Sequence, residues 1–94
     1  MEKRKLKILE LIDGAHHTIE TFHQELRALK GAEGKIERQR FLLADMACHL
    51  VQDAIENDEM DIESLKNRLY SILTVCDAFL PEKDLKTKAN EIIA

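Results

Sequence analysis

The sequence predicts an all-α protein: an antiparallel helical bundle of three main helices plus a shorter C-terminal helix, with coiled-coil-like packing. Apolar residues recur at alternating spacings of four and three in two parts of the chain, and a segment between them is apolar around most of its circumference. A repeat of about 3.5 residues keeps one apolar edge of a helix turned toward a partner helix. We assign residues 1–94 to a single helical domain.

The first helix is predicted over residues 5–30. Its apolar pattern passes through Gly14 without a shift, which favours a continuous helix, and a residue without a side chain would let a neighbouring backbone approach closely. Two glycines within Gly31–Gly34 then predict a loop. The predicted seam of this helix is formed by Ile8, Ile12, Ala15, Ile19, Phe22, Leu26 and Leu29.

The second helix is predicted over residues 35–57. Its apolar arc covers roughly 220° when successive residues are placed about 100° apart. A helix this apolar must be covered on two sides, so we expect it in the middle of the bundle. The acidic stretch Glu56–Asp61 follows as a loop, with Asp58 or Asp61 capping the next helix.

The third helix is predicted over residues 62–80 and a short fourth helix over 81–93. Pro81 ends the third helix and suits the first position of the fourth, because proline has no backbone N–H to donate. The seam of the third helix is formed by Ile62, Leu65, Leu69, Ile72, Cys76 and Phe79.

Charge and hydropathy exclude several classes of protein. The net charge of −4 argues against direct nucleic-acid binding by the whole surface. No apolar run approaches the roughly 18 residues of a membrane span, and the basic start lacks the apolar region of a signal peptide, so we expect a cytoplasmic protein with no membrane association. Cys48 and Cys76 should stay reduced, with Cys76 buried as a small hydrophobe on its seam.

One candidate metal site lies on the first helix. His16, Glu20 and His23 are spaced four and three apart on one helical edge, and Glu20 to His23 is a Glu-x-x-His step. In ferritin-like di-iron bundles that step occurs twice, whereas it occurs once here. We therefore favour histidine rings that cover the edge of the seam and expect no cofactor, while a homodimer that joins two copies of the motif remains an alternative.

A second polar edge lies on the second helix. Asp45 and Asp53 each lie one helical turn from His49, and the two carboxylates would favour a protonated imidazole. We interpret this edge as a solvated face, with a pH-responsive site as the alternative.

No catalytic constellation can be assembled from residues close in sequence, and the apolar seams exceed what three short-looped helices cover. We therefore expect a non-enzymatic interaction protein, regulatory or adaptor in role, that binds an unidentified protein partner and forms a homodimer. Acting on a DNA-binding protein without touching DNA is a further option. The candidate interface residues are Leu6, Leu9, Phe41, Leu42 and Ile55.

An enzyme is the alternative. In length and helix order, with a long first helix, the chain resembles the all-helical chorismate mutases, which form intertwined dimers. That resemblance implies a dianionic substrate held by inward-facing arginine and lysine side chains with a glutamate or glutamine. The first seam has no inward arginine where such a site requires one. The central cations are Arg27, Lys35, Arg38 and Arg40.

Overall fold

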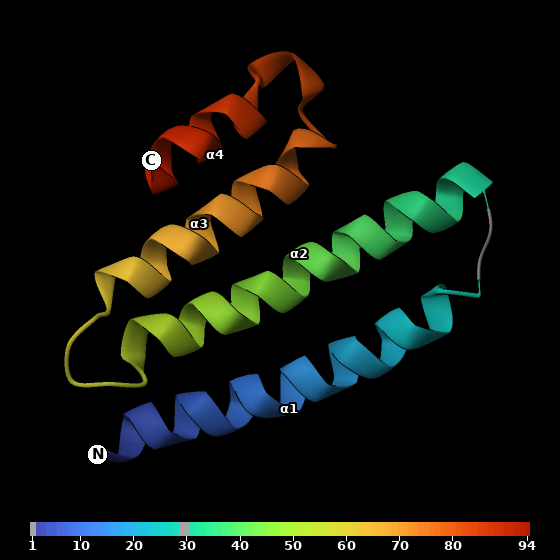
Figure 1. The fold of residues 1–94 in the computed structure, drawn as a ribbon. Coiled ribbons are helices and arrows are strands. Elements are labelled where there is room, and N and C mark those ends of the chain that lie inside the picture. Colours follow the sequence, from blue (N-terminus) through green and yellow to red (C-terminus); the bar gives the residue numbers. More distant parts are fainter. Residues whose placement is uncertain (1, 29–30) are drawn as a thin grey trace.

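The computed structural model describes residues 2–28 and 31–94, and these form four α-helices and one 3-10 turn. Consecutive helices pack side by side in chain order and run in alternating directions (Figure 1). The predicted all-α fold is confirmed, and the second helix has its predicted central place. The elements are α1 (Lys3–Leu26), α2 (Gly31–Ile55), α3 (Ile62–Asp77), η1 (Pro81–Lys83) and α4 (Leu85–Ile93). None of the four helices combines the length and the apolar character needed to cross a membrane.

The four helices lie in a single layer rather than around a shared centre (Figure 1). The molecule measures 45 × 34 × 14 Å along its principal axes, and its shortest dimension is close to the diameter of one helix, about 10–12 Å. Its radius of gyration is 15.0 Å, whereas a compact domain of this length has about 12–13 Å. Among the described hydrophobic residues, those that are buried are Leu26, Cys48, Val75 and Ala89.

The layered shape leaves a large solvent-accessible surface. The chain exposes 6864 Å², compared with roughly 5,500 Å² for a typical folded monomer of 10.8 kDa. Ten large hydrophobic side chains are exposed among the described residues, the most exposed being Leu11 at 61%. The isolated chain therefore hides less of its apolar surface than its size allows.

The edge that α1 turns toward α2 is shifted from the one that its apolar pattern predicts, and it keeps Ile12, Ile19 and Leu26 of the predicted seam. Ile8, Ala15 and Phe22 of the predicted seam are exposed, and Leu29 lies outside the described residues. The apolar arc of α1 is wider than one seam, so the packed edge can shift sideways and include two histidines. The shielded positions, again spaced three and four apart, are Lys5, Leu9, Ile12, His16, Ile19, His23 and Leu26.

The turn between α1 and α2 lies earlier in the chain than predicted. Helix α1 ends at Leu26 rather than near residue 30, and α2 begins at Gly31 rather than near residue 35. Gly31 has φ +87°, a conformation that side chains rarely allow, so one glycine supplies the turn while Gly34 is buried inside the helix. Nη1 of Arg38 donates a 3.3 Å hydrogen bond to the Leu26 carbonyl, which ties the end of α1 to α2.

The ends of α3 and α4 follow local capping chemistry. Oδ1 of Asp61 accepts hydrogen bonds from the backbone N–H groups of Glu63 and Ser64, so Asp61 is the N-cap. Helix α3 stops at Asp77, three residues earlier than predicted. Pro81 opens η1 rather than α4, because Asp84 adopts a left-handed conformation (φ 52°, ψ 46°) that separates the two.

Gly14 tests whether a neighbouring backbone packs closely against the middle of α1. A Cβ built there would meet nothing within 4 Å, so the close approach of a neighbouring backbone that its small size suggested is wrong. We expect Gly14→Ala to raise the free energy of unfolding by about 1 kcal/mol, measured by chemical denaturation, because alanine loses less backbone entropy in a helix interior.

The control is the same substitution at Gly31, where φ is +87°. Gly31→Ala should destabilise the protein by about 1 kcal/mol, because a left-handed conformation is strained in alanine. A loss of stability in Gly14→Ala would contradict the open surroundings of this residue.

Candidate functional site

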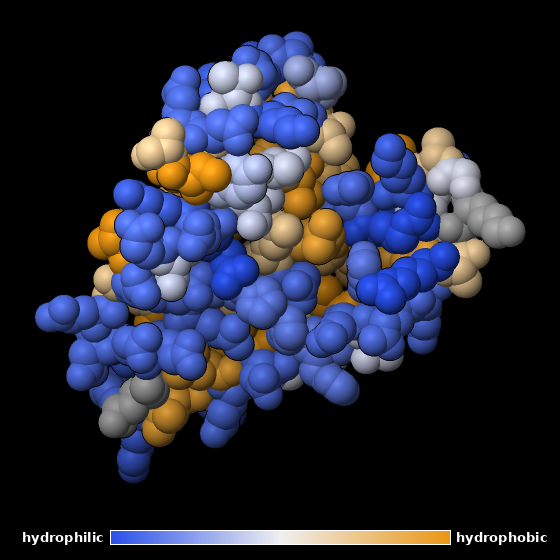
Figure 2. Space-filling model, viewed as in Figure 1, coloured by the Kyte–Doolittle hydropathy of each residue, from blue (hydrophilic) through white to orange (hydrophobic). Residues whose placement is uncertain are grey.

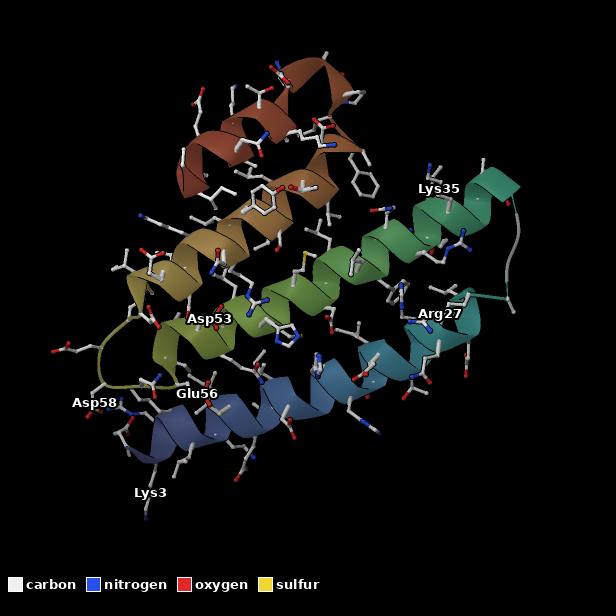
Figure 3. All side chains as sticks on the ribbon, in the orientation of Figure 1. Lys3, Arg27, Lys35, Asp53, Glu56 and Asp58 are labelled. Atoms are coloured by element: carbon white, nitrogen blue, oxygen red, sulfur yellow. The ribbon has the colours of Figure 1, made fainter. Side chains whose placement is uncertain are left out.

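A hollow of about 380 Å³ lies between α1 and α2. Arg27, which lines it, is on the side of the layer turned toward the reader in Figure 3. This broad face of the molecule is mostly hydrophilic (Figure 2). The hollow collects three of the four histidines together with two carboxylates. Its lining residues are His16, Ile19, Glu20, His23, Arg27, Leu42, Asp45 and His49.

Two helices bring the central side chains of the hollow together. Asp45 and His49 lie one turn apart on α2, so they share a face, and His16 approaches them from α1. Nε2 of His16 lies 2.7 Å from Oδ1 of Asp45, and Nε2 of His49 lies 3.5 Å from Oδ2. The two imidazole rings meet edge to face, with centroids 4.6 Å apart. These three residues, His16, Asp45 and His49, are called the His–Asp–His cluster below.

The carboxylate at the centre of the cluster has an incomplete hydrogen-bond shell. Oδ1 of Asp45 is buried and accepts no hydrogen bond of regular geometry from any described residue, although His16 is near. The 2.7 Å approach therefore joins two atoms whose N–H direction and lone pairs are poorly aligned. Such a group is satisfied either when an imidazole N–H turns toward it or when it shares a third atom with its neighbours.

The candidate metal residues predicted from sequence line this hollow, but the residues closest to His16 are not the ones predicted. His16, Glu20 and His23 all line it, and Oε2 of Glu20 lies 3.9 Å from Nδ1 of His16. The closer partners of His16, Asp45 and His49, come from α2. The spacing of residues along α1 could not reveal them, because it carries no information about the register of the neighbouring helix.

The predicted polar edge of α2 is divided between two neighbours. Asp45 and His49 face α1, with 26% and 32% of their side chains exposed, so they are shielded between helices rather than on a solvated face. Asp53 instead binds Arg68 of α3, with Oδ2 2.8 Å from Nε. The three residues therefore do not act as one group.

An apolar surface lies on the opposite side of the layer. Phe22 follows Glu20 by two residues, and Val51 follows His49 by two, which places each about 200° around its helix from the hollow. Phe22 stacks on Phe41 with ring centroids 4.7 Å apart, joining α1 to α2. We define the apolar face by this stack and its helical neighbours: Ile8, Leu11, Ala15 and Phe22 of α1, and Phe41, Ala44, Ala47, Val51 and Ile55 of α2.

The five candidate interface residues divide between the two sides. Phe41 and Ile55 belong to the apolar face. Leu6 and Leu9 line a shallow hollow with Glu10, Asp13, Gln52 and Glu56 on the polar side, and Leu42 lines the hollow that holds the His–Asp–His cluster.

Comparison with known proteins adds no assignment. No family model, curated protein or solved structure matches this chain. Functional inference therefore depends on the hollow and the apolar face themselves.

The two cysteines are both free, but their burial differs from the prediction for Cys76. Cys48 is 6% exposed, on the side of α2 that faces α1, while Cys76 is half-buried, so the expectation that Cys76 is the buried thiol is wrong. Burial, and secondarily the Asp45 carboxylate, raise the pKa of the Cys48 thiol. A raised pKa leaves less of the reactive thiolate at neutral pH.

We expect Cys76 to be alkylated by iodoacetamide at neutral pH at least about tenfold faster than Cys48 in the folded protein, because Cys48 has less thiolate and less access. Peptide mass spectrometry distinguishes the two sites. In denaturant the rates should become similar, and faster alkylation of Cys48 under native conditions would contradict the packing of α1 on α2.

Proposed function

We propose that the protein is a non-enzymatic helical interaction protein that works as a homodimer, in which the apolar faces of two copies pack together. The observation that carries the proposal is the exposed area of the single chain. Its 6864 Å² exceeds the expected surface by about 1,400 Å². Standard interfaces bury about 800 Å² per partner and obligate dimers more, so the excess matches the area that a stable dimer would bury.

A second copy of the chain suits the composition of the apolar face. The face is continuous across two helices, and its residues recur at the spacings by which helices pack on helices. Ala44 and Ala47 keep its α2 side flat, so that a facing helix can approach closely. Because a twofold interface uses one patch on both subunits, a mostly apolar patch is compatible with itself; Arg40 lies beside it, lining a hollow with Phe41 and Ala44. Pairing of two chains would also stack two layers of helices, and folded domains usually contain at least two packed layers.

The surroundings of the central cations favour this role over the chorismate-mutase-like alternative. Of the four, Arg27 lines the hollow that holds the His–Asp–His cluster, where a dianion would also meet the carboxylates of Glu20 and Asp45. Arg38 donates to the Leu26 carbonyl, and Arg40 pairs with Glu37 at 2.8 Å. Lys35 lines a separate hollow beside Phe79. A site that concentrates positive charge on one substrate is not assembled by these residues.

A dimer would present its outer surfaces to other molecules. With the apolar faces paired, each subunit would expose its hydrophilic face, and a protein partner would meet that face (Figure 2). Free Cys48 and Cys76 suit a reducing compartment, and we place the protein in the cytoplasm. We propose a regulatory or adaptor role, because a protein that binds a partner protein without catalysing a reaction acts on that partner by binding alone.

Leu11 is the most direct test of the dimer. It is 61% exposed on the apolar face, so Leu11→Glu should leave the single chain folded but place two carboxylates in each interface. We expect the wild type to sediment at about twice 10.8 kDa and Leu11→Glu to raise the dissociation constant at least about 100-fold, because desolvating an unpaired charge costs several kcal/mol.

Leu6→Glu is the matched control, since Leu6 is a leucine of the same helix, 46% exposed on the polar side. Its mass should stay that of the wild type, and circular dichroism should show equal helicity in all three proteins. A monomeric wild type, or dissociation by Leu6→Glu and not by Leu11→Glu, would overturn the proposal.

A further inference from the structure

The His–Asp–His cluster brings two imidazole nitrogens and a carboxylate oxygen to one place. These ligand atoms all lie within 4.8 Å of one another. In a tetrahedral zinc site with bonds of about 2.0–2.1 Å, ligand atoms lie roughly 3.3 Å apart. We expect rotation of the His16 and His49 side chains to bring the three atoms to that spacing when an ion binds.

We propose that His16, Asp45 and His49 bind one divalent transition-metal ion per chain, with Zn²⁺ as the principal ion. Two imidazoles and one carboxylate form a ligand set that zinc uses at sites where a fourth position is left open. The inference does not rest on the proposed dimer, because the cluster and the apolar face lie on opposite sides of the layer.

The buried oxygen of Asp45 supports a bound cation. Oδ1 is shielded from water and accepts no well-directed hydrogen bond from the described part of the chain, although Nε2 of His16 is only 2.7 Å away. A buried acceptor left in this state is destabilising unless another group satisfies it. A metal ion between Oδ1 and Nε2 would satisfy both atoms, since each would offer it a lone pair.

The neighbouring residues suit the geometry of a metal-bound histidine. If Nε2 of His16 binds the ion, its Nδ1 carries the proton, and Oε2 of Glu20 lies 3.9 Å from that nitrogen. Carboxylates commonly accept this second proton and hold the ring in place. The 3.9 Å separation is longer than a hydrogen bond, so Glu20 is assigned as a positioning residue on the basis that its exposed side chain turns toward Nδ1 when the ion binds. Arg27 is the one lysine or arginine among the described residues of the lining, and Glu20 and Asp45 together outweigh its charge.

The test uses the full chain without a histidine tag, stripped of metal and titrated with ZnCl₂ by calorimetry. We expect one Zn²⁺ per chain, and at least about 100-fold weaker binding in His16→Gln, Asp45→Asn and His49→Gln, because each removes one of three ligands. Glu20→Gln should weaken binding about 10-fold, as expected for loss of a group that orients a ligand.

His17→Gln is the matched control, because His17 is the exposed neighbour of His16 on α1 and is absent from the cluster. It should bind Zn²⁺ like the wild type, and so should Leu11→Glu even as a monomer. Bound Co²⁺ supplies a spectroscopic readout, since its visible absorption reports ligand number and should change in Asp45→Asn. Absence of saturable binding, or equal weakening by His17→Gln, would overturn the proposal and leave the cluster as an ion pair.

Discussion

The antiparallel contact between α1 and α2 is the constraint on which both candidate functional surfaces depend. Two independent contacts show the same register: His16 meets Asp45 on one side of the helix pair, and Phe22 stacks on Phe41 on the other. The hydrogen bond from Arg38 to the Leu26 carbonyl holds this register close to the connecting turn. A slip by one helical turn would therefore separate the histidine cluster and the aromatic stack together.

The single layer of helices separates the two candidate functional surfaces onto opposite faces. Each helix packs on its neighbours along its sides, which leaves two broad faces of the layer open to other molecules (Figure 1). One face carries carboxylates, histidines and cations around the hollow, and the other carries aliphatic and aromatic side chains. Since folded domains are only marginally stable, the few buried residues of one layer make association through the apolar face energetically important.

Periodicity predicted the elements and their order, because burial against a neighbour requires apolar residues at helical spacing. It also placed α2 in the centre, whereas capping chemistry left Asp58 and Asp61 as alternatives, of which Asp61 is the N-cap. The packed edge of α1 could not be chosen in the same way, since its apolar arc is wider than one seam and hydropathy scores His16 and His23 as polar. The register that joins His16 to Asp45 and His49 is a property of two helices, and the left-handed Asp84 follows no strong sequence signal.

The central claim is that one chain leaves an apolar face uncovered and needs a second copy to cover it. The most direct test is the thermal unfolding midpoint of the wild type measured from about 1 to 100 μM protein, because coupling of folding to dimerisation makes this temperature depend on concentration. We expect the midpoint to rise steadily by several degrees over that range. A midpoint that stays constant, with a monomeric mass throughout, would contradict the account.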